Sequence, residues 1–311
     1  MKIVIPEGID IISKPCFKKI SELGETVIYD DFPKTDEEVI KRIKNAEIVI
    51  SKIIRLNANI LMQCPRLKYI IILSVGINFI DIKKATELGI KIVNCPTHNS
   101  QAVAEHVFAL LFSLFRNVVE AQLRIRNKGW RNTPYEFIGT ELKYKRMGLI
   151  GHGQIGKIVE GMAKALGMTV SFVNSKNSDQ EIDNLMKESD IVSIHVNSTS
   201  KTVHMINSRR LGLMKKTAYL INTSRGEIVD MQALYKMLQN KLIAGAGLDV
   251  FENEPFRCSP SERIIGLACL PNVIATPHIG FNTVETGIRG GEEIISNLKA
   301  IISGSPINIK N

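Results

Sequence analysis

The sequence predicts an α/β protein with two doubly wound parallel sheets. Three observations support this fold class. Short runs rich in Val and Ile recur at even spacing, segments with helical periodicity lie between them, and one apolar run leads directly into a glycine-rich motif. This alternation is typical of parallel sheets that helices cover on both faces. A chain of 311 residues is long enough for two domains, each with its own hydrophobic core.

The first part of the chain contains short apolar runs that we expect to be strands, at Lys2–Ile5, Thr26–Asp30, Glu47–Ser51, Lys68–Ser74 and Lys91–Cys95. Helical periodicity lies between them at Asp36–Lys44 and Asp81–Leu88. The next segment, Gln101–Arg126, is predicted to be one long helix that could join the two domains, because its apolar residues fall on one helical face.

The second part contains six more strand-like runs, at Arg146–Gly151, Thr169–Val173, Ile191–Val196, Ala218–Thr223, Gly245–Val250 and Asn272–Pro277. Helical segments separate them, at Ile155–Leu166, Glu181–Glu188 and Met231–Lys241. Six such units predict a Rossmann domain, residues 98–281. The last expected helix, Thr283–Ile302, could return to the first part of the chain. The Rossmann domain would then be an insertion in a flavodoxin-like domain formed by residues 1–97 and 282–311.

The glycine pattern Gly151-His152-Gly153-Gln154-Ile155-Gly156 stands between an expected strand and an expected helix. In this context Gly151 permits a tight turn, Gly153 lets the backbone approach a pyrophosphate, and Gly156 allows close packing of helix on strand. The helix amino terminus would face the phosphates. The pattern therefore predicts a dinucleotide site, with an ordinary structural loop as the alternative.

Three potentially reactive side chains, Arg225, Glu254 and His278, each follow closely on a strand-like run. Ligands of open parallel sheets bind beyond the carboxyl ends of the strands, so these groups are expected to converge on one bound molecule. Taken singly, the same residues could be a surface ion-pair partner, a loop carboxylate and a core or capping histidine. Their common position at strand ends favours a shared catalytic site.

Composition excludes several other classes of function. The net charge of +9 comes from Lys and Arg scattered among Asp and Glu, without the aromatic-interleaved basic patch of a nucleic-acid binder. No apolar run approaches the roughly 20 residues that a membrane span needs. The start of the chain has no secretory signal pattern, so the expected compartment is the cytoplasm.

Cysteine and histidine spacing gives no reason to expect a metal or a disulfide framework. The five cysteines form no CxxC pair and are expected to be reduced. The histidines show no HxxxH spacing, so we predict no metal site. Packing or hydrogen bonding is the expected role of His98, His106, His195 and His204.

The chain contains five further segments of interest, in the order GHGQIG, SDIVSIHV from Ser189, INTSRGEIVD from Ile221, AGLDVFENEP from Ala246 and NVIATPHIG from Asn272. In these segments and in their order it resembles the D-isomer-specific 2-hydroxyacid dehydrogenases. The resemblance covers nearly the whole chain. It implies that Arg225 orients the substrate carboxylate and carbonyl, that His278 is the acid/base, and that Glu254 is its carboxylate partner. It also implies that the cofactor-binding residues include Gly151, Gly153, Gln154, Ile155, Gly156, Thr223 and Asp249, with Asp249 accepting a hydrogen bond from the nicotinamide amide.

The residue types suit that chemistry independently. Reduction of a keto group needs a proton on its oxygen as hydride reaches its carbon, and His278 can supply that proton near neutral pH. A carboxylate beside an imidazole favours its charged form and fixes its orientation, which is the role expected of Glu254. The planar fork of Arg225 matches a carboxylate.

In the first domain, Ser74-Val75-Gly76 resembles the family loop whose backbone amides hold the substrate carboxylate. Lys52 and Asn78 resemble residues of the glycerate dehydrogenase and hydroxypyruvate (glyoxylate) reductase branch. The resemblance therefore implies Lys52, Val75, Gly76 and Arg225 as substrate-binding residues. The alternative is that Asn78 caps a turn and Lys52 is merely solvated.

Cofactor choice depends on the end of the second Rossmann strand, where NAD-preferring proteins place an Asp. This chain has Asn174 there, followed by Ser175 and Lys176, which offer a hydroxyl and a positive charge where a 2′-phosphate would lie. We expect a preference for NADPH, and use of NADH remains open.

The expected function is reduction of a small 2-keto acid, of the hydroxypyruvate or glyoxylate type, to the D-2-hydroxy acid with NAD(P)H. The expected assembly is a homodimer, because the apolar helix from Gln101 resembles the family's dimer arm. The alternative is a dinucleotide-sensing scaffold of the corepressor type that binds protein partners. A formate-dehydrogenase-like activity is disfavoured, because that branch has a glutamine where Glu254 stands here.

Overall fold

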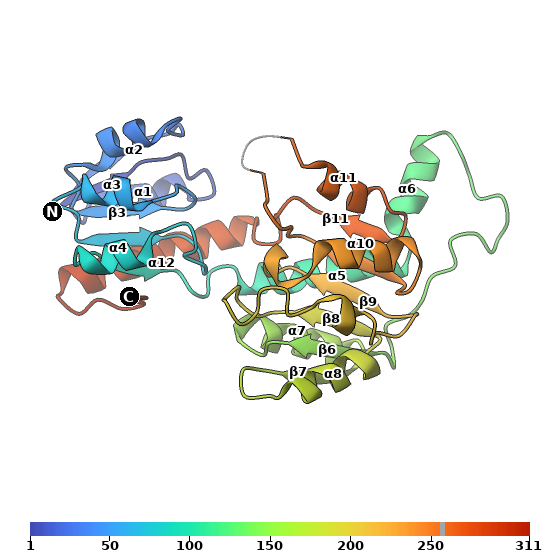
Figure 1. Cartoon of the computed structure of the whole chain (residues 1–311). Helices are drawn as coiled ribbons and strands as arrows, with labels where there is room; N and C mark the ends of the chain where they lie inside the picture. The colour runs from blue at the N-terminus through green and yellow to red at the C-terminus, as the bar shows by residue number, and fades with distance from the viewer. Residues whose placement is uncertain (256–258) are drawn as a thin grey trace. The chain divides into compact units, whose positions relative to one another are not determined.

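The computed structural model describes residues 1–255 and 259–311. It divides into two compact units: unit 1 consists of Met1–Asn99 and Asn282–Asn311, and unit 2 of Ser100–Phe281 (Figure 1). Both chain termini belong to unit 1, because its last helix follows the whole of unit 2 in sequence. Cys16, Cys64, Cys95 and Cys269 are free thiols, and Cys258 lies outside the described residues.

Unit 1 is built on a parallel sheet of five strands in the order β2-β1-β3-β4-β5. This order is that of flavodoxin-like folds. The strands are β1 (Lys2–Ile5), β2 (Glu25–Ile28), β3 (Ile48–Ser51), β4 (Tyr69–Ile72) and β5 (Lys91–Asn94). The central strands β3 and β4 are almost entirely buried, which explains their unbroken Ile and Val runs.

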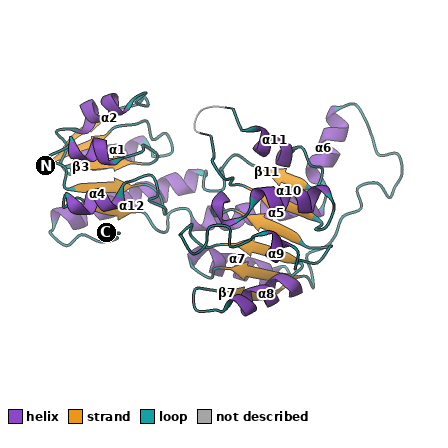
Figure 2. Ribbon diagram, in the orientation of Figure 1, coloured by secondary structure: helices purple, strands orange, loops and turns teal. Residues whose placement is uncertain are grey.

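Helices cover both faces of this sheet (Figure 2). They are α1 (Lys14–Ser21), α2 (Asp36–Ile43), α3 (Ala58–Met62), α4 (Ile82–Glu87) and α12 (Val284–Ile302). The side chains of Thr35, Asn57, Asp81 and Thr283 cap the amino ends of α2, α3, α4 and α12. α12 packs against α1, and a Cβ at Gly287 would lie 1.8 Å from the carbonyl oxygen of Ile11, so only glycine permits this approach.

Unit 2 contains a parallel sheet of six strands in the order β11-β10-β9-β8-β6-β7. They are β6 (Arg146–Ile150), β7 (Thr169–Val173), β8 (Ile191–Ile194), β9 (Tyr219–Asn222), β10 (Gly245–Leu248) and β11 (Val273–Ala275). The chain moves outward from β6 to β7, then crosses to the other side of β6 and continues through β8 to β11. The strand order therefore reverses between β6 and β8, where open sheets bind ligands.

Two helical layers enclose the sheet of unit 2. On one face lie α5 (Ser100–Phe115) and α7 (Gln154–Ala165). The other face carries α8 (Asp179–Glu188), α9 (Ser208–Leu211), α10 (Met231–Gln239) and α11 (Glu262–Ala268). A short 3₁₀ helix, η1 (Gly226–Ile228), follows β9 directly. Among these, α8 has a complete capping box formed by Ser178 and Glu181.

The prediction of one long helix over Gln101–Arg126 was wrong. α5 ends at Phe115, and α6 (Val118–Arg126) leaves at an angle of 63°. Between them Asn117 adopts a left-handed backbone (φ 51°), and its amide donates to the carbonyls of Phe137 and Ile138 at 3.2 and 3.1 Å. These acceptors are distant in sequence, so helical periodicity does not reveal the break.

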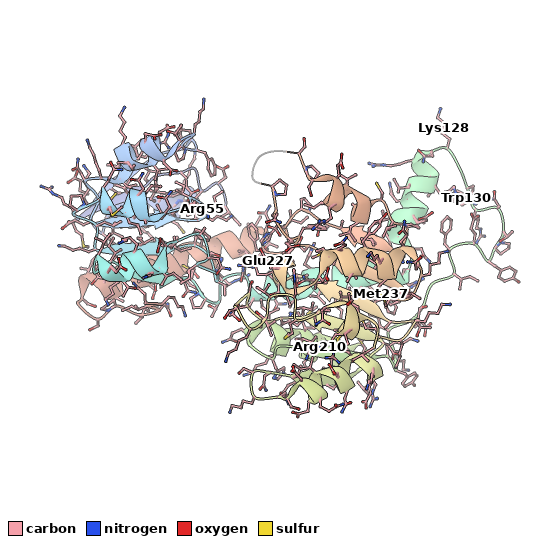
Figure 3. All side chains as sticks on the ribbon, viewed as in Figure 1. Arg55, Lys128, Trp130, Arg210, Glu227 and Met237 are labelled. Carbon is pink, nitrogen blue, oxygen red and sulfur yellow. The ribbon has the colours of Figure 1, made fainter. Side chains whose placement is uncertain are left out.

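α6 and the loop that follows it are largely exposed. No residue of α6 is buried, and Trp130 is 70% exposed on the loop, which extends away from the sheet (Figure 3). Within the described ranges no single helix is long and apolar enough to cross a membrane; only α5 and α6 taken together, across their bend, pass by length and composition.

Candidate active site

The glycine motif forms the turn between β6 and α7. Gly151 has a φ of 101°, and a Cβ there would lie 2.4 Å from the carbonyl oxygen of His195. A Cβ at Gly156 would lie 2.6 Å from the oxygen of Gly151, so the first turn of α7 closes tightly on the loop. A Cβ at Gly153 would meet nothing within 4 Å. The loop is thus tightly packed where it folds, at positions that require glycine, and open where a ligand would approach.

Thr223 gives an independent sign of a ligand at the carboxyl edge of this sheet. Its hydroxyl follows β9, the residue is only 8% exposed, and the oxygen has no hydrogen-bond partner within residues 1–255 and 259–311. Leaving a buried hydroxyl unsatisfied costs free energy, so such an atom indicates a missing partner. Together with the open Gly153 and the uncapped amino end of α7, the residues present fit a dinucleotide.

The loop after β7 presents Asn174, Ser175 and Lys176, and all three are exposed. Asn174 stabilises this loop through two hydrogen bonds. Its side-chain oxygen accepts from the backbone amide of Lys176 at 2.9 Å, and its backbone amide donates to the side-chain oxygen of Asn177 at 2.8 Å. No carboxylate stands at the strand end itself. Glu181, four residues from Asn177, is already occupied by the capping box of α8.

His278 and Glu254 are in direct contact. Nδ1 of His278 lies 2.6 Å from Oε2 of Glu254, and the other carboxylate oxygen accepts from the amide of Phe251 at 2.9 Å. The imidazole remains 39% exposed and lies edge-on to the ring of Phe281. His278 has a left-handed backbone (φ 53°), a conformation held by the hydrogen bond of its amide to the carbonyl oxygen of Asp249 at 2.8 Å.

Arg225 follows β9 on an adjoining loop. Its guanidinium donates to the carbonyl oxygen of Ser224 at 2.7 Å, and in the described part of the chain it forms no ion pair. The next residue, Gly226, packs on the backbone of Phe251 so closely that a Cβ would lie 1.9 Å from its carbonyl carbon. Phe251 in turn holds Glu254, so the loop of Arg225 and the loop of Glu254 rest on one another.

Asp249, at the end of β10, is 2% exposed. One oxygen accepts from the hydroxyl of Thr276 (2.6 Å) and the amide of Ile279 (2.9 Å), and the other from the amide of Gly280 (2.8 Å). Burial would raise the pKa of this carboxyl, but hydrogen bonds from His106, Thr276 and the two amides outweigh it and hold the pKa below its usual value. The sequence did not reveal that this carboxylate accepts hydrogen bonds from the segment that carries His278.

Lys52 lies in unit 1, after β3. Its amide donates to Oε1 of Glu7 at 2.6 Å, and the same oxygen accepts from the amides of Ile53 and Ile54 and from the hydroxyl of Ser51. Burial lowers the pKa of Lys52, while the charges of Glu7 and Asp10 oppose this shift. Glu7 is fully buried, and sequence reasoning missed it because its partners are at least 44 residues away.

Val75 and Gly76 follow β4 in the same unit. The side chain of Asn94 donates to the carbonyl oxygen of Val75 at 2.8 Å, which fixes the peptide that joins these two residues. Their own amide N–H groups donate to no acceptor within residues 1–255 and 259–311. Two free amides on a fixed turn are suited to an anionic oxygen.

The remaining histidines serve the local structure. His195 bonds Ser193 at 2.9 Å, His98 bonds the carbonyl of Cys95 at 2.9 Å, and His204 bonds Glu252 at 3.2 Å. Burial lowers the pKa of both His98 and His195 to about 4. The described residues contain no group of His, Cys, Asp or Glu that could hold a metal ion.

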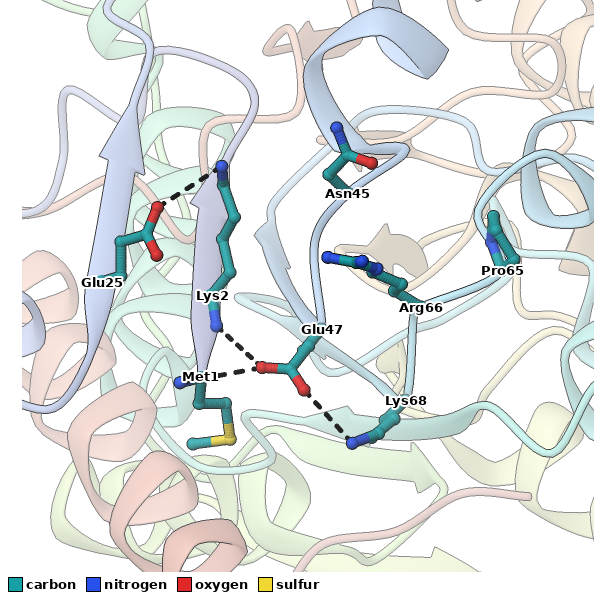
Figure 4. A pocket seen from close by; sticks show the side chains of 8 residues that line it. All are labelled: Met1, Lys2, Glu25, Asn45, Glu47, Pro65, Arg66 and Lys68. Atoms are coloured by element: carbon teal, nitrogen blue, oxygen red, sulfur yellow. Dashed lines mark hydrogen bonds and ion pairs between the residues drawn. The ribbon is translucent and has the colours of Figure 1, made fainter.

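A cavity of about 830 Å³ in unit 1 lies at the wrong place for this chemistry. It opens at the amino ends of β1 and β2, and most of its charged groups pair with one another: Glu47 with Lys68 and the amino terminus, and Lys2 with Glu25 (Figure 4). Parallel sheets bind ligands at the opposite, carboxyl edge. We therefore assign this cavity no role in catalysis.

Comparison with known proteins identifies the family. Residues 108–280, more than half of the chain, match the family model described as "D-isomer specific 2-hydroxyacid dehydrogenase, NAD binding domain". The chain belongs to this family. The protein is therefore an NAD(P)-dependent oxidoreductase of the D-2-hydroxyacid dehydrogenase type, and the expected family and fold class are confirmed.

Relatives of known name are similar over most of their length. A glyoxylate reductase of Thermofilum pendens is 37% identical, covering 94% of this chain and 90% of its own. A hydroxypyruvate reductase of Blautia hydrogenotrophica is 31% identical over the whole of both chains. Similar solved structures include an acyclic imino acid reductase in complex with NADPH and D-Arg (TM-score 0.90, 34% identity, 100% of both chains). Another is a D-lactate dehydrogenase of Aquifex aeolicus with NAD and lactic acid (TM-score 0.84, 31% identity, 98% and 96% of the chains).

Proposed function

We propose that this dehydrogenase reduces a small 2-keto acid of the hydroxypyruvate or glyoxylate type to the 2-hydroxy acid, of D configuration where the product is chiral. The observation that carries the proposal is the 2.6 Å contact between Nδ1 of His278 and the Glu254 carboxylate. A carboxylate is an acceptor only, so Nδ1 carries the hydrogen of this bond and Nε2 is the atom left to exchange a proton with substrate.

Each residue has a distinct role in this scheme. His278 donates its Nε2 proton to the carbonyl oxygen, and Glu254 stabilises and orients the imidazole before and after that transfer. Arg225, which has no carboxylate partner among the described residues, polarises the carbonyl and holds the substrate carboxylate. A bound reduced nicotinamide would supply the hydride to the carbonyl carbon.

Unit 1 also offers groups suited to a carboxylate. The free amides of Val75 and Gly76 and the ammonium group of Lys52 are proposed to hold it, because all three follow neighbouring strands at the carboxyl edge of the sheet. The names of the glyoxylate and hydroxypyruvate reductases that resemble this chain support a substrate of two or three carbons.

We propose NADPH as the preferred cofactor. An Asp at the end of the second Rossmann strand would accept from the ribose hydroxyls and repel a 2′-phosphate, and Asn174 removes that repulsion. Ser175 and Lys176 are exposed beside it and can contact the phosphate. Similar structures were solved with NADPH and with NAD, so the proposal rests on Asn174, Ser175 and Lys176.

Turnover of a substrate panel tests the function. Glyoxylate, hydroxypyruvate, pyruvate and phenylpyruvate are assayed with NADPH and with NADH, and we expect the first two acids to give the highest kcat/KM. His278→Ala should lower kcat by about 100-fold or more while the cofactor Kd stays within about twofold. No turnover with any keto acid, combined with nucleotide-dependent binding of a protein partner, would favour the corepressor-like scaffold instead.

The cofactor proposal has a matched pair of variants. Asn174→Asp restores the carboxylate and should shift the kcat/KM ratio of NADPH to NADH by about 10-fold or more towards NADH. Lys176→Ala should weaken the binding of NADPH and leave the binding of NADH nearly unchanged. Equal or better turnover of the wild type with NADH at matched concentrations would reject the preference.

We also propose a homodimer that uses α6 and its following loop. This segment exposes several large apolar side chains, namely Val118, Val119, Leu123, Ile125, Trp130, Tyr135 and Ile138. A patch of this kind is rare on a monomer's surface. Light scattering should give about twice the 34.6 kDa of one chain, and a Trp130→Arg, Tyr135→Arg variant should be monomeric. A monomeric wild type would refute this assembly.

A further inference from the structure

The segment around His278 is held by one buried carboxylate. Asp249 accepts hydrogen bonds from Thr276, Ile279 and Gly280, which lie on both sides of His278 in sequence, and its carbonyl oxygen accepts from the amide of His278 itself. A Cβ at Gly280 would lie 2.8 Å from Oδ2 of Asp249, so the segment also packs directly on this carboxylate. The position of the imidazole is therefore set by groups bonded to Asp249.

A histidine from a different element completes this arrangement. His106 projects from α5, and its Nε2 lies 2.9 Å from the hydroxyl oxygen of Thr276 and 3.3 Å from Oδ1 of Asp249. Its side chain is 16% exposed. α5 itself is anchored in the core by Ala104, Val107 and Leu111, so it provides a rigid support.

The direction of these hydrogen bonds follows from their chemistry. An ionised carboxylate only accepts, so the single hydroxyl hydrogen of Thr276 points to Asp249 at 2.6 Å. The oxygen of Thr276 must then accept from His106, and Nε2 of His106 carries a hydrogen. The same N–H is also directed towards Asp249, which agrees with the contribution of His106 to the lowered pKa of that carboxyl.

We propose that His106 is a positioning residue for His278, acting through Thr276 and Asp249. Its N–H fixes the hydroxyl of Thr276, which fixes the orientation of Asp249, which holds the peptide groups on both sides of the catalytic imidazole. The inference rests on the proposed role of His278 as proton donor. Without His106 the segment keeps its backbone bonds but loses, among the hydrogen bonds and ion pairs of the described residues, its only one to a side chain of α5.

Matched variants separate the donated hydrogen bond from side-chain volume. His106→Leu and Thr276→Val keep the approximate size and remove the bond, whereas His106→Gln and Thr276→Ser can restore it. We expect the first pair to lower kcat by about 10-fold to 100-fold, since a displacement of about 1 Å at a reacting group has effects of this size. His106→Gln and Thr276→Ser should retain most of the wild-type kcat. KM for the cofactor should change by less than about twofold.

A double variant tests whether the two side chains act together. Because His106 acts through Thr276, the combined His106→Leu, Thr276→Val protein should lose no more kcat than either single variant. Ser113→Ala is the control, because Ser113 lies two turns further along α5 and lines the same cavity of about 350 Å³ as His106 and Thr276. It should leave kcat unchanged. A melting temperature that falls in each variant with kcat unaltered at 25 °C would overturn the proposal and assign His106 a purely structural role.

Nitrogen NMR of the six histidines gives a readout that does not depend on turnover. Single substitutions assign the ring signals, and those of His278 should show one Nδ1–H tautomer in the wild type. In His106→Leu the His278 signals should shift and broaden, and in His106→Gln they should return towards the wild type. His278 signals that are identical in the wild type and His106→Leu would refute the inference. Absence of turnover in the wild type would instead refute the proposed function, and the spectra would still decide the positioning role.

Discussion

Nδ1 of His278 and Oε2 of Glu254 lie 2.6 Å apart although 24 residues separate them in sequence. The contact exists because β10 and β11 are adjacent and parallel, so the loops that leave their carboxyl ends lie side by side. The amide of Phe251 donates a hydrogen bond to Oε1 of Glu254, which fixes the carboxylate and so orients Oε2 towards His278. The imidazole thus has a fixed tautomer without being buried.

Replacing Glu254 by Gln tests the charge of this pair. Gln keeps the size and one acceptor oxygen but removes the negative charge that stabilises a protonated imidazole. We expect kcat to fall by about 100-fold, with the cofactor Kd unchanged. Glu254→Asp, which keeps the charge and shortens the reach, should retain more activity than Gln if charge is the larger contribution. A Gln variant with wild-type kcat would show that His278 needs only orientation.

Gly226 should be unusually sensitive to substitution. A Cβ at this position would lie 1.9 Å from the carbonyl carbon of Phe251, so alanine must push the Arg225 loop and the Glu254 loop apart. Gly226→Ala should lower the free energy of unfolding by about 3 kcal/mol, as overpacking against backbone does, and should reduce kcat. Urea unfolding measures the first effect and steady-state kinetics the second.

Gly161 provides the matched control for that experiment. It lies on the exposed side of α7, and a Cβ there would meet nothing within 4 Å. Gly161→Ala should raise the free energy of unfolding by up to about 1 kcal/mol, because alanine favours the helix. Equal effects of the two substitutions would contradict the close contact at Phe251.

The strands and the position of the active site could be predicted because both follow from local patterns. Runs of Val and Ile mark buried parallel strands, and residues after such strands share one edge of the sheet. The positions of Glu254 and His278 after two strands therefore predict that they lie near each other, as they do. Such patterns could not place Asn117 in a left-handed conformation, because the carbonyls that stabilise it come from a loop 20 residues away. Glu7 was missed for the same reason. A hydrogen-bonding role was expected for His106, but not its partner Thr276, which is 170 residues away in sequence.

Stability should fall as the pH is lowered from about 6.5 to about 4. Burial lowers the pKa of His195 to about 4, whereas an unfolded histidine titrates near 6.5. Between these values the unfolded chain binds more protons than the folded one, so this contribution to stability is complete above pH 6.5 and is lost as the pH falls towards 4. Asp183, whose pKa is lowered to about 2 by Arg209 and Arg210 against the opposing effect of burial, titrates below this window.

Urea unfolding at pH 7, 6 and 5 measures this dependence. The wild type should become less stable with each step, and His195→Gln, which cannot ionise, should show a smaller slope. His98 shares the same lowered pKa, so a His98→Asn, His195→Gln variant should show the smallest slope of all. A slope that is unchanged in both variants would mean that neither imidazole remains neutral inside the fold.

The buried carboxylate of Glu7 should control both the shape and the charge of the Lys52 loop. Its Oε1 accepts from Ser51, Lys52, Ile53 and Ile54, so Glu7→Leu would leave buried donors without a partner and cost about 3 kcal/mol of unfolding free energy. Glu7→Gln keeps that acceptor oxygen and should cost about 1 kcal/mol. The Gln variant therefore removes the charge while the loop stays in place.

The same variant tests whether Lys52 binds the substrate as a cation. Burial lowers the pKa of Lys52, and the charge of Glu7 opposes this effect, so removing the charge should lower the pKa further. The KM for the keto acid should rise as the pH passes through this pKa, because a neutral amine no longer attracts a carboxylate. In Glu7→Gln the rise should begin at a lower pH than in the wild type, whereas Lys52→Met should show a high KM at every pH. Identical KM profiles for the wild type and Glu7→Gln would exclude Lys52 as a substrate-binding cation, and the carboxylate would then be held by Arg225 and the amides of Val75 and Gly76 without it.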